Sequence, residues 1–324
     1  MSTVDVFSVS FFAVLVLLIT AVPGYLLLKF KALPESAITS FSKILVFVCQ
    51  PCLAVYTFSS AEFSVEKLCD IGVFALLCLV IHAVMLGGSY LVLRRKYSDA
   101  IYRIMTVANT LGNCAFFGIP ILEAIYGEGT DLILFTTVYA VVMNVLGWTV
   151  CSAIMSGDTG YVSLKKVLIN PALIGAAVAM ILFCFRIPLT FTLPFTDRSF
   201  GILESTVTAA ARMATPLSMI VMGMRLATME FKSIFTDPRV YLTSLIKQMI
   251  MPLIAFALVF FLPIDGSMKQ VFYIICACPV ASVVLNYAEM CGQGQKEAAK
   301  MLLLGTMMSS LTLPVMMLLL PFLT

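Results

Sequence analysis

A group of polar and helix-breaking residues interrupts one of the most apolar stretches of the chain. Asn113, Gly118 and Pro120 lie close together within GNCAFFGIPILEAIYG, residues 112–127. Glycine weakens a helix, proline removes a backbone donor, and a buried asparagine needs hydrogen-bond partners. A side-chain amide both donates and accepts, and the free N–H groups of a restarted helix carry partial positive charge. The chemistry that this combination offers is recognition of a small anion such as a carboxylate.

A similar combination recurs in the second half of the chain. Pro279, in ACPVASVV, interrupts another apolar run and is followed by Ser282 and then Asn286, in that order of preference as ligand contacts. Pro51 in CQPCLAV and Pro216 in ATPLSMI form a further pair at nearly the same spacing as Gly112 and Pro279. Two pairs at one spacing indicate two related halves.

Other polar residues inside apolar runs have two interpretations each. Asn144, in VVMNVLGW, serves either an interhelical hydrogen bond or a substrate contact. Glu123 and Glu289 lie toward the ends of the interrupted helices, where they either reach water or act as protonatable coupling groups. His82, the only histidine, is either a packed neutral ring or a proton-coupling group.

Two basic residues also lie inside apolar runs. Arg212 is expected near the middle of its run, where an arginine costs about 2.5–3.5 kcal/mol on insertion scales. Glu204 is about 12 Å away along a helix, which is too far for a direct pair. Arg212 is therefore a candidate to bind a substrate carboxylate, with a structural pair to another helix as the alternative. Lys247, near the start of its run, is expected to extend to the membrane surface.

The elements that must position these residues are membrane helices. The 324 residues are 61% hydrophobic and 11% charged, and the mean hydropathy is +1.06, whereas a soluble domain carries far more charge. We therefore expect an all-α polytopic membrane protein with the lipid bilayer as its main solvent. Ten apolar runs are long enough to cross a bilayer: 6–28, 38–60, 69–93, 101–126, 130–154, 168–189, 199–226, 238–262, 268–291 and 297–322.

Lysine and arginine are unevenly distributed among the loops that join these runs. The loops after odd-numbered runs carry Lys29, Lys31, Lys43, Arg94, Arg95, Lys96, Arg103, Lys165, Lys166, Arg225, Lys232, Arg239, Lys296 and Lys300. The other loops carry only Lys67, Arg186, Arg198 and Lys269. Because basic loops stay in the cytoplasm, the odd loops are predicted to be cytoplasmic and both termini external.

Ten runs with both termini on one side divide into two halves of five. The first half is expected over residues 1–154, a connecting cytoplasmic loop over 155–167, and the second half, inverted relative to the first, over 168–324. Unwound backbone at membrane depth is tolerated only where it is buried in protein or lines a cavity. Broken helices at corresponding positions of inverted halves indicate the binding site of a secondary transporter.

Four segments resemble the auxin efflux carrier family, which includes the plant PIN-FORMED exporters and bacterial relatives. NCAFFGIPILEAIYG is similar to the family's N-T-x-x-x-G-I-P run, and LKKVLINPALIGAAVAMIL to its K-K-x-x-x-N-P opening of the sixth helix. AARMATPLSMIVMGMRLA and GTMMSSLTLPVMM resemble its seventh and tenth helices. The resemblance implies ten transmembrane helices in two inverted five-helix repeats, as in bile-acid symporters, with helices 4 and 9 broken and crossed.

The resemblance also implies roles for helices and residues. Helices 1, 2, 6 and 7 would form a scaffold, and helices 3–5 and 8–10 a transport domain. By position, Asn113 matches the crossover asparagine and Pro279 the crossover proline. Gly112 and Val280 depart from the proline and glutamine of the plant carriers, and the long cytoplasmic loop of many plant members is short here. Auxin and loop-based regulation are therefore poor expectations, and the implied location is the bacterial cytoplasmic membrane.

Together these observations predict a secondary transporter of small organic acid anions, mono- or dicarboxylates such as the malonate and malate associated with bacterial family members. Sodium-coupled symport of the bile-acid type and a membrane sensor are the alternatives; coupling to H+ or Na+ and a homodimer are left open. No catalytic motif is found, and no cofactor, metal site or nucleic-acid partner is expected. The predicted substrate-binding residues are Gly112, Asn113, Cys114, Pro120, Pro279, Val280, Ser282, Asn286, Arg212, Pro51 and Asn144, and the predicted coupling residues are His82, Glu123 and Glu289.

Overall fold

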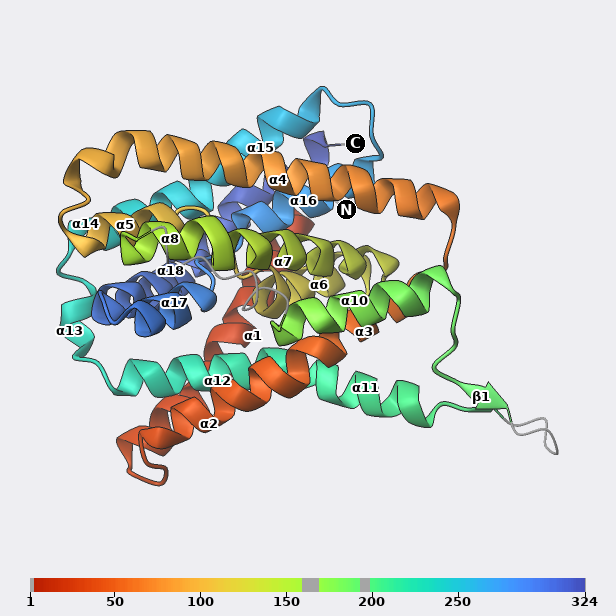
Figure 1. Cartoon of the computed structure of the whole chain (residues 1–324), viewed down its shortest axis with the longest axis horizontal. Coiled ribbons are helices and arrows are strands. Elements are labelled where there is room, and N and C mark those ends of the chain that lie inside the picture. The colour runs from red at the N-terminus through yellow and green to blue at the C-terminus, as the bar shows by residue number, and fades with distance from the viewer. Residues whose placement is uncertain (1–2, 159–168, 193–198, 324) are drawn as a thin grey trace.

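Long apolar helices dominate the computed structural model, which describes residues 3–158, 169–192 and 199–323 (Figure 1). In this part of the chain seven helical segments are long and apolar enough to cross a membrane, and two shorter apolar helices accompany them. The strands described are a single antiparallel pair, β1 (Phe191–Thr192) and β2 (Ser199–Phe200). The prediction of an all-α polytopic membrane protein is confirmed, apart from this short hairpin.

The first half forms five units, of which the fourth is broken. Its elements are α1 (Thr3–Lys29); α2 (Ser36–Ile44), η1 (Leu45–Cys49) and α3 (Gln50–Ser59); α4 (Val65–Leu93) and η2 (Arg94–Lys96); α5 (Ala100–Ala108), η3 (Cys114–Gly118) and α6 (Ile119–Tyr126); and η4 (Asp131–Ile133), α7 (Leu134–Leu146), η5 (Gly147–Cys151) and α8 (Ser152–Ser156).

The second half repeats this order, and its fourth unit is again broken. Its five described units are α10 (Pro171–Cys184); α11 (Ile202–Arg212) and α12 (Ala214–Ala227); α14 (Pro238–Leu245), η7 (Ile246–Ile250) and α15 (Met251–Phe260); α16 (Gly266–Ala277) and α17 (Val283–Cys291); and α18 (Gln295–Met317) and η8 (Leu320–Phe322). The short α13 (Phe231–Ile234) lies in the connection between the second and third of these units. Residues 159–167 of the predicted connecting loop, 155–167, lie outside the described residues.

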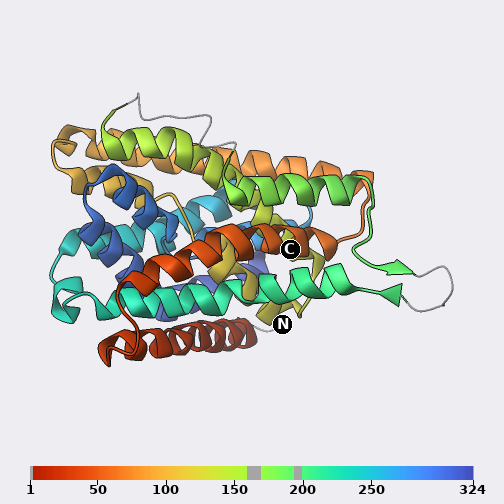
Figure 2. The same cartoon turned by 60° about the horizontal axis from the view of Figure 1, so that its bottom comes forward.

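The connections between units lie at two opposite ends of the molecule. Residues 30–35, 94–99 and 228–237 lie at the left end of Figure 2, whereas residues 60–64 and the β1–β2 hairpin lie at the right end. The left-hand connections follow the odd-numbered units and are the ones rich in lysine and arginine. The fold therefore has the alternation of loops on which the predicted topology depends.

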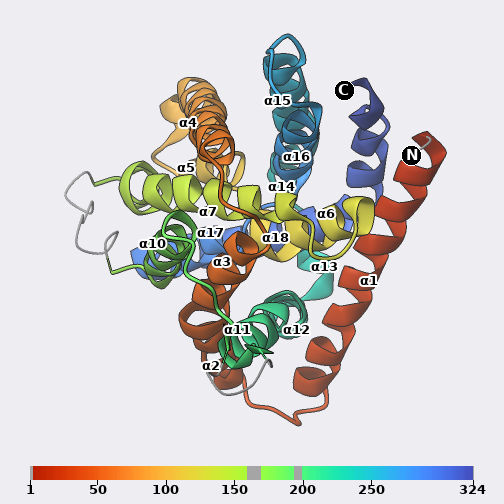
Figure 3. The same cartoon turned by 90° about the vertical axis from the view of Figure 1, so that its right-hand side faces the viewer.

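Two groups of helices are visible along the long axis of the molecule. In Figure 3, α2, α3, α11 and α12 lie below the centre, and α4, α15 and α16 lie above it. Small residues allow α1 and α10 to approach the lower group closely. A Cβ added to Gly24 of α1 would overlap the carbonyl oxygen of Ile220 in α12, and one added to Gly175 of α10 would overlap Pro51 of α3.

Polar side chains at the boundaries define where several helices begin. Ser64, Asn170 and Asp265 each accept a hydrogen bond from a backbone N–H in the first turn of the helix that follows. Asp237 caps α14 in the same way, and the Arg239 guanidinium beside it holds the pKa of the Asp237 carboxyl below its ordinary value. These caps satisfy helix-end donors that would otherwise face lipid headgroups or protein.

Candidate functional site

The two broken units meet in a short antiparallel bridge centred on Gly112. Residues 111–113 pair with residues 279–281. The backbone N–H of Asn113 donates to the carbonyl oxygen of Pro279 at 2.8 Å. The backbone N–H of Ala281 donates to the carbonyl oxygen of Leu111 at 2.9 Å. The backbone groups that the breaks release therefore satisfy one another, which a buried backbone requires. The predicted crossing of helices 4 and 9 is confirmed.

Local sequence explains where each break falls. Asn113 has φ −77° and ψ 63°, outside the helical region, and the chain then restarts as a wide turn over Cys114–Gly118. Pro120 lies at the start of α6, where its missing N–H is not needed. In the other half, Cys278 is extended at φ −61° and ψ 148°, as expected of a residue that precedes a proline. Pro279 thus ends α16.

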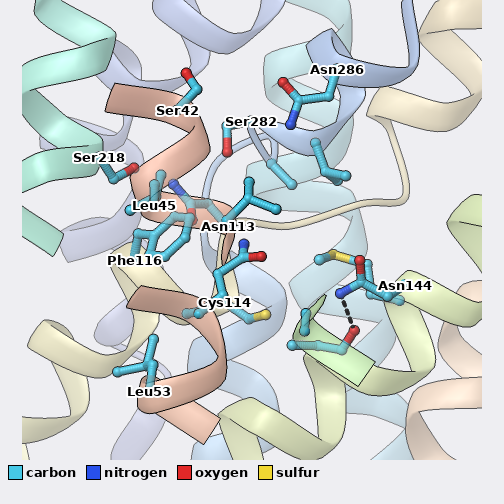
Figure 4. Close-up of a pocket in the computed structure, with 18 of the residues that line it drawn as sticks. Ser42, Leu45, Leu53, Asn113, Cys114, Phe116, Asn144, Ser218, Ser282 and Asn286 are labelled. Atoms are coloured by element: carbon cyan, nitrogen blue, oxygen red, sulfur yellow. Dashed lines mark hydrogen bonds between the residues drawn. The ribbon is translucent and has the colours of Figure 1, made fainter. Parts of the chain in front are cut away.

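A pocket of about 160 Å³ lies against the crossing. Figure 4 shows Asn113 near its centre, with Ser282 and Asn286 on one side and Ser42 and Ser218 across from them. The polar and charged side chains that line it are Ser42, Gln50, Asn113, Thr137, Asn144, Trp148, Asn170, Ser218, Arg225, Ser282 and Asn286. Among the described residues lining the pocket, Arg225 is the one charged side chain, and none is aspartate or glutamate.

Asn113 presents its side chain to this pocket. The residue is 7% exposed, and its side-chain amide makes no hydrogen bond within the described part of the chain. Gly112 and Cys114 line the pocket beside it, and Ser282 and Asn286 reach it from the start of the α17 segment. With Asn144, which also lines the pocket, six of the predicted binding residues are therefore brought together at one place.

Asn144 makes a hydrogen bond between helices and also lines the pocket, so it fits both interpretations that the sequence leaves open. Its Nδ2 donates to the carbonyl oxygen of Ala140 at 2.7 Å, and its Oδ1 accepts from Nδ2 of Asn170 at 3.3 Å. This second bond joins α7 to the start of α10, where Asn170 also accepts from the N–H of Ala172. Both asparagines line the pocket. The role of Asn170 was not predicted, although it is the asparagine of the NP pair in the sixth-helix motif.

Arg225 is another pocket residue that was not predicted from the sequence. It lies near the end of α12, and its Nη1 is 2.7 Å from Oε1 of Glu289 on α17. The arginine side chain is 18% exposed and the glutamate side chain 44%. In the sequence Arg225 contributes only to the count of basic loop residues. Glu289, predicted to reach water or to act in coupling, is partly exposed and also has this ionic partner at the edge of the pocket. A role in coupling stays a prediction.

Several predicted residues do not line the pocket. Pro279 and Val280 contribute backbone to the crossing. Pro120 lies in the first turn of α6, and Pro51 packs against Gly175 of α10. Arg212 lies outside the pocket, with Nη2 3.5 Å from Oε2 of Glu128 and a side chain that is 58% exposed. A pair with another segment is the alternative to substrate binding that the sequence leaves open for Arg212.

The other two predicted coupling residues also lie away from the pocket lining. Oε1 of Glu123 accepts a hydrogen bond of 3.3 Å from the hydroxyl of Tyr56. His82 is fully buried, its Nδ1 is 2.6 Å from the carbonyl oxygen of Cys78, and its ring lies 4.8 Å from that of Tyr139. The structure thus gives His82 the packed environment of its first interpretation, and whether either residue takes part in coupling stays a prediction.

The two halves are also matched separately by one family model. The model, described as a membrane transport protein, matches residues 9–166 and again residues 158–317. Each match contains one broken unit and therefore one side of the crossing. None of the curated proteins matches the chain.

Proposed function

Because the chain belongs to the membrane transport protein family, which is auxin efflux carrier-like, we propose that it is a secondary transporter of small organic acid anions that works by alternating access at the crossing. The family is one of transporters and not of enzymes, and the chain is a multi-pass membrane protein. The substrate class, the mechanism and the orientation in the membrane are the parts that we propose.

The polar character of the pocket is the observation that supports an anion most strongly. Its described lining offers amides, hydroxyls and the Arg225 guanidinium, without a carboxylate. Hydrogen-bond donors and a guanidinium are groups that suit a carboxylate ligand. The volume of about 160 Å³ is below the roughly 300–1,000 Å³ that holds drug-sized ligands. A small mono- or dicarboxylate suits this space better than a sterol-sized bile acid.

Substrate recognition would combine the crossing with Arg225. The free amide of Asn113 and the groups of Ser282 and Asn286 offer hydrogen bonds, and Arg225 offers a charged fork suited to a carboxylate. The Arg225 guanidinium already forms an ion pair with Glu289. A substrate carboxylate would therefore compete with Glu289, so that binding loosens a contact between α12 and α17.

Alternating access would use the two groups of helices that enclose the pocket. One wall comes from the α2–α3 unit, α10 and α12, and the other from η3, α7 and α17. We assign the first set, with α1 and α11, to the scaffold and the second, with the rest of the third, fourth and fifth units of each half, to the transport domain. Displacement of one set against the other would carry the pocket between the two membrane faces. Ser42 and Arg225 lie toward the end with the basic loops, which we assign to the cytoplasm.

Reconstituted transport tests this proposal. Proteoliposomes preloaded with unlabelled malonate, malate, acetate or a bile acid are given the same compound in labelled form outside. The proposal expects transient accumulation of the label for at least one small carboxylate and for no bile acid. Imposed Na+ and H+ gradients separate uncoupled exchange from sodium-coupled symport. Binding without accumulation for every acid would favour the membrane-sensor alternative and contradict transport.

A further inference from the structure

Lys247 occupies an unexpected place in the fold. The sequence predicts a side chain that extends to the membrane surface, and this prediction is wrong, because Lys247 is 0% exposed. It lies in the wide turn Ile246–Ile250, nine residues after Pro238 and so about 14 Å along the helix. At this depth a lysine chain cannot carry its ammonium to water, and charged residues retained inside a membrane protein commonly serve its function.

The Lys247 ammonium binds the end of a broken helix. Its Nζ donates to the carbonyl oxygens of Cys276 and Cys278 at 2.8 and 2.9 Å. These carbonyls belong to the last turn of α16 and to the residue before Pro279, where the helix has no further N–H groups to offer them. The end of a helix carries partial negative charge. Carbonyl oxygens at the ends of broken helices are also the ligands that free coupling cations use in transporters.

The ammonium charge has no carboxylate partner in the part of the chain that the structure describes. None of the ion pairs there includes Lys247. The titratable groups that face it are the thiols of Cys114, Cys276 and Cys278 and the ring of His82. A neutral thiol or imidazole does not cancel a positive charge, so the helix end is its main compensation.

The charge also lies directly behind the pocket. Gly112 lines the pocket, and a Cβ added to Gly112 would come within 2.9 Å of Nζ of Lys247. The absence of a side chain at Gly112 lets the ammonium approach the backbone of the crossing. Because Coulomb interactions are strong where water is excluded, this charge acts on an anion in the pocket without touching it.

We propose that Lys247 is a tethered counter-cation of the crossing, which takes the place of a free Na+ and increases the affinity of the pocket for anions. The ammonium holds the carbonyl end of α16 in both conformations of the carrier. Anion exchange by the wild-type protein is then independent of Na+. Lys247 acts as a positioning residue through Gly112 and α16, and this inference rests on the proposed function.

Two variants test the charge and the cation position separately. Lys247→Met keeps most of the length of the side chain and removes its charge, so the affinity for labelled malonate is expected to fall at least tenfold. Lys247→Ala frees the two carbonyls and leaves space for an ion. Its thermal midpoint in detergent is expected to be higher in NaCl or KCl than in choline chloride, whereas the midpoint of the wild type is the same in all three. Lys43→Met, in the last turn of α2 where the side chain is exposed, is the control.

The results test the two roles proposed for Lys247, attraction of an anion and replacement of a free cation. A wild-type exchange rate that falls when choline replaces Na+ would overturn the inference, as would a Lys247→Met variant with wild-type affinity. If the thermal midpoint of Lys247→Ala is the same in NaCl, KCl and choline chloride, Lys247 does not replace a free cation. If the wild type moves no organic anion while the Lys247→Ala midpoint still depends on Na+ or K+, the cation position stands and the proposed function fails.

Discussion

The backbone of Asn113 holds the crossing together while its side chain faces the pocket. The N–H donates to the carbonyl of Pro279, and the amide group is left without a protein partner in the described residues. Substitution of the side chain can therefore remove a ligand contact and keep the bridge, which separates binding from folding at a single position.

Asn113→Ala is expected to insert normally and to weaken anion binding. Loss of one hydrogen bond to a charged group is worth roughly 1.5–3 kcal/mol, or about ten- to a hundredfold in Kd. Equilibrium binding of labelled malonate to the purified variant measures it. Asn109→Ala is the control, since Asn109 is buried at the end of α5 and bonds Ser89 outside the pocket. Wild-type affinity in Asn113→Ala would reduce Asn113 to a packing role.

Arg225 and Arg212 provide a comparison of two arginines. Arg225 lines the pocket and Arg212 does not, so Arg225→Gln is expected to reduce the affinity for malonate at least tenfold and Arg212→Gln less than twofold. The difference is expected because Arg225→Gln removes a partly buried charge that would pair with the substrate carboxylate, whereas Arg212 is more than half exposed and lies outside the pocket. Initial rates over a range of malonate concentrations measure both. The opposite order would restore Arg212 as the countercharge.

Residues beside the breaks could be predicted from sequence, whereas residues across the pocket could not. Asn113, Ser282 and Asn286 follow glycine or proline signals that act locally. Arg225 and Asn170 reach the pocket through the packing of helices that are distant in sequence, and a single sequence contains no measure of that packing. The prediction for Lys247 is wrong for a related reason. Its side chain faces the end of α16 and not the membrane surface, and this depends on helix packing.

At the scale of helices, small residues set how closely neighbouring helices pack. The α1–α12 contact at Gly24 and the α10–α3 contact at Gly175 leave no room for a Cβ. The breaks themselves could be predicted, because proline and glycine act on the nearest turn. The close contacts could not, since the sequence does not say which glycine faces a neighbouring helix and which faces lipid.

Gly24→Ala tests the role of these contacts. The added methyl group meets the backbone of α12, so a loss of about 1–3 kcal/mol is expected from overpacking and should appear as a lower thermal midpoint in detergent. Gly87→Ala is the matched control, because a Cβ there has no neighbour within 4 Å. It is expected to hold or raise the midpoint, since alanine favours the helix. Equal midpoints for the two variants would contradict the account of the α1–α12 contact.

At the scale of the whole molecule, the alternation of basic loops and the two matched halves both indicate a second half that is inverted relative to the first. The family model covers each half separately, and the connections rich in lysine and arginine share one end of the fold. The number of units and their order could be predicted because hydrophobic length and charge are properties of the sequence itself. The way in which the two halves enclose the pocket depends on the packed structure.

Membrane orientation is tested by a reporter at each end of the molecule. In a cysteine-free background, Ser156→Cys is expected to react only with a reagent that reaches the cytoplasm, because it lies at the end with the basic loops. Glu66→Cys, at the start of α4 on the opposite end, is expected to react with an impermeant reagent on intact cells. Labelling of Ser156→Cys on intact cells would reverse the orientation.

Access to the pocket from both membrane faces tests the central claim most directly. A single cysteine at Ser282 lines the pocket beside the crossing, and an impermeant thiol reagent is applied to right-side-out and inside-out vesicles in the presence and absence of a transported carboxylate. The account predicts labelling from each side and protection by the carboxylate on both. Labelling from one side alone, unchanged by the carboxylate, would contradict alternating access at this pocket.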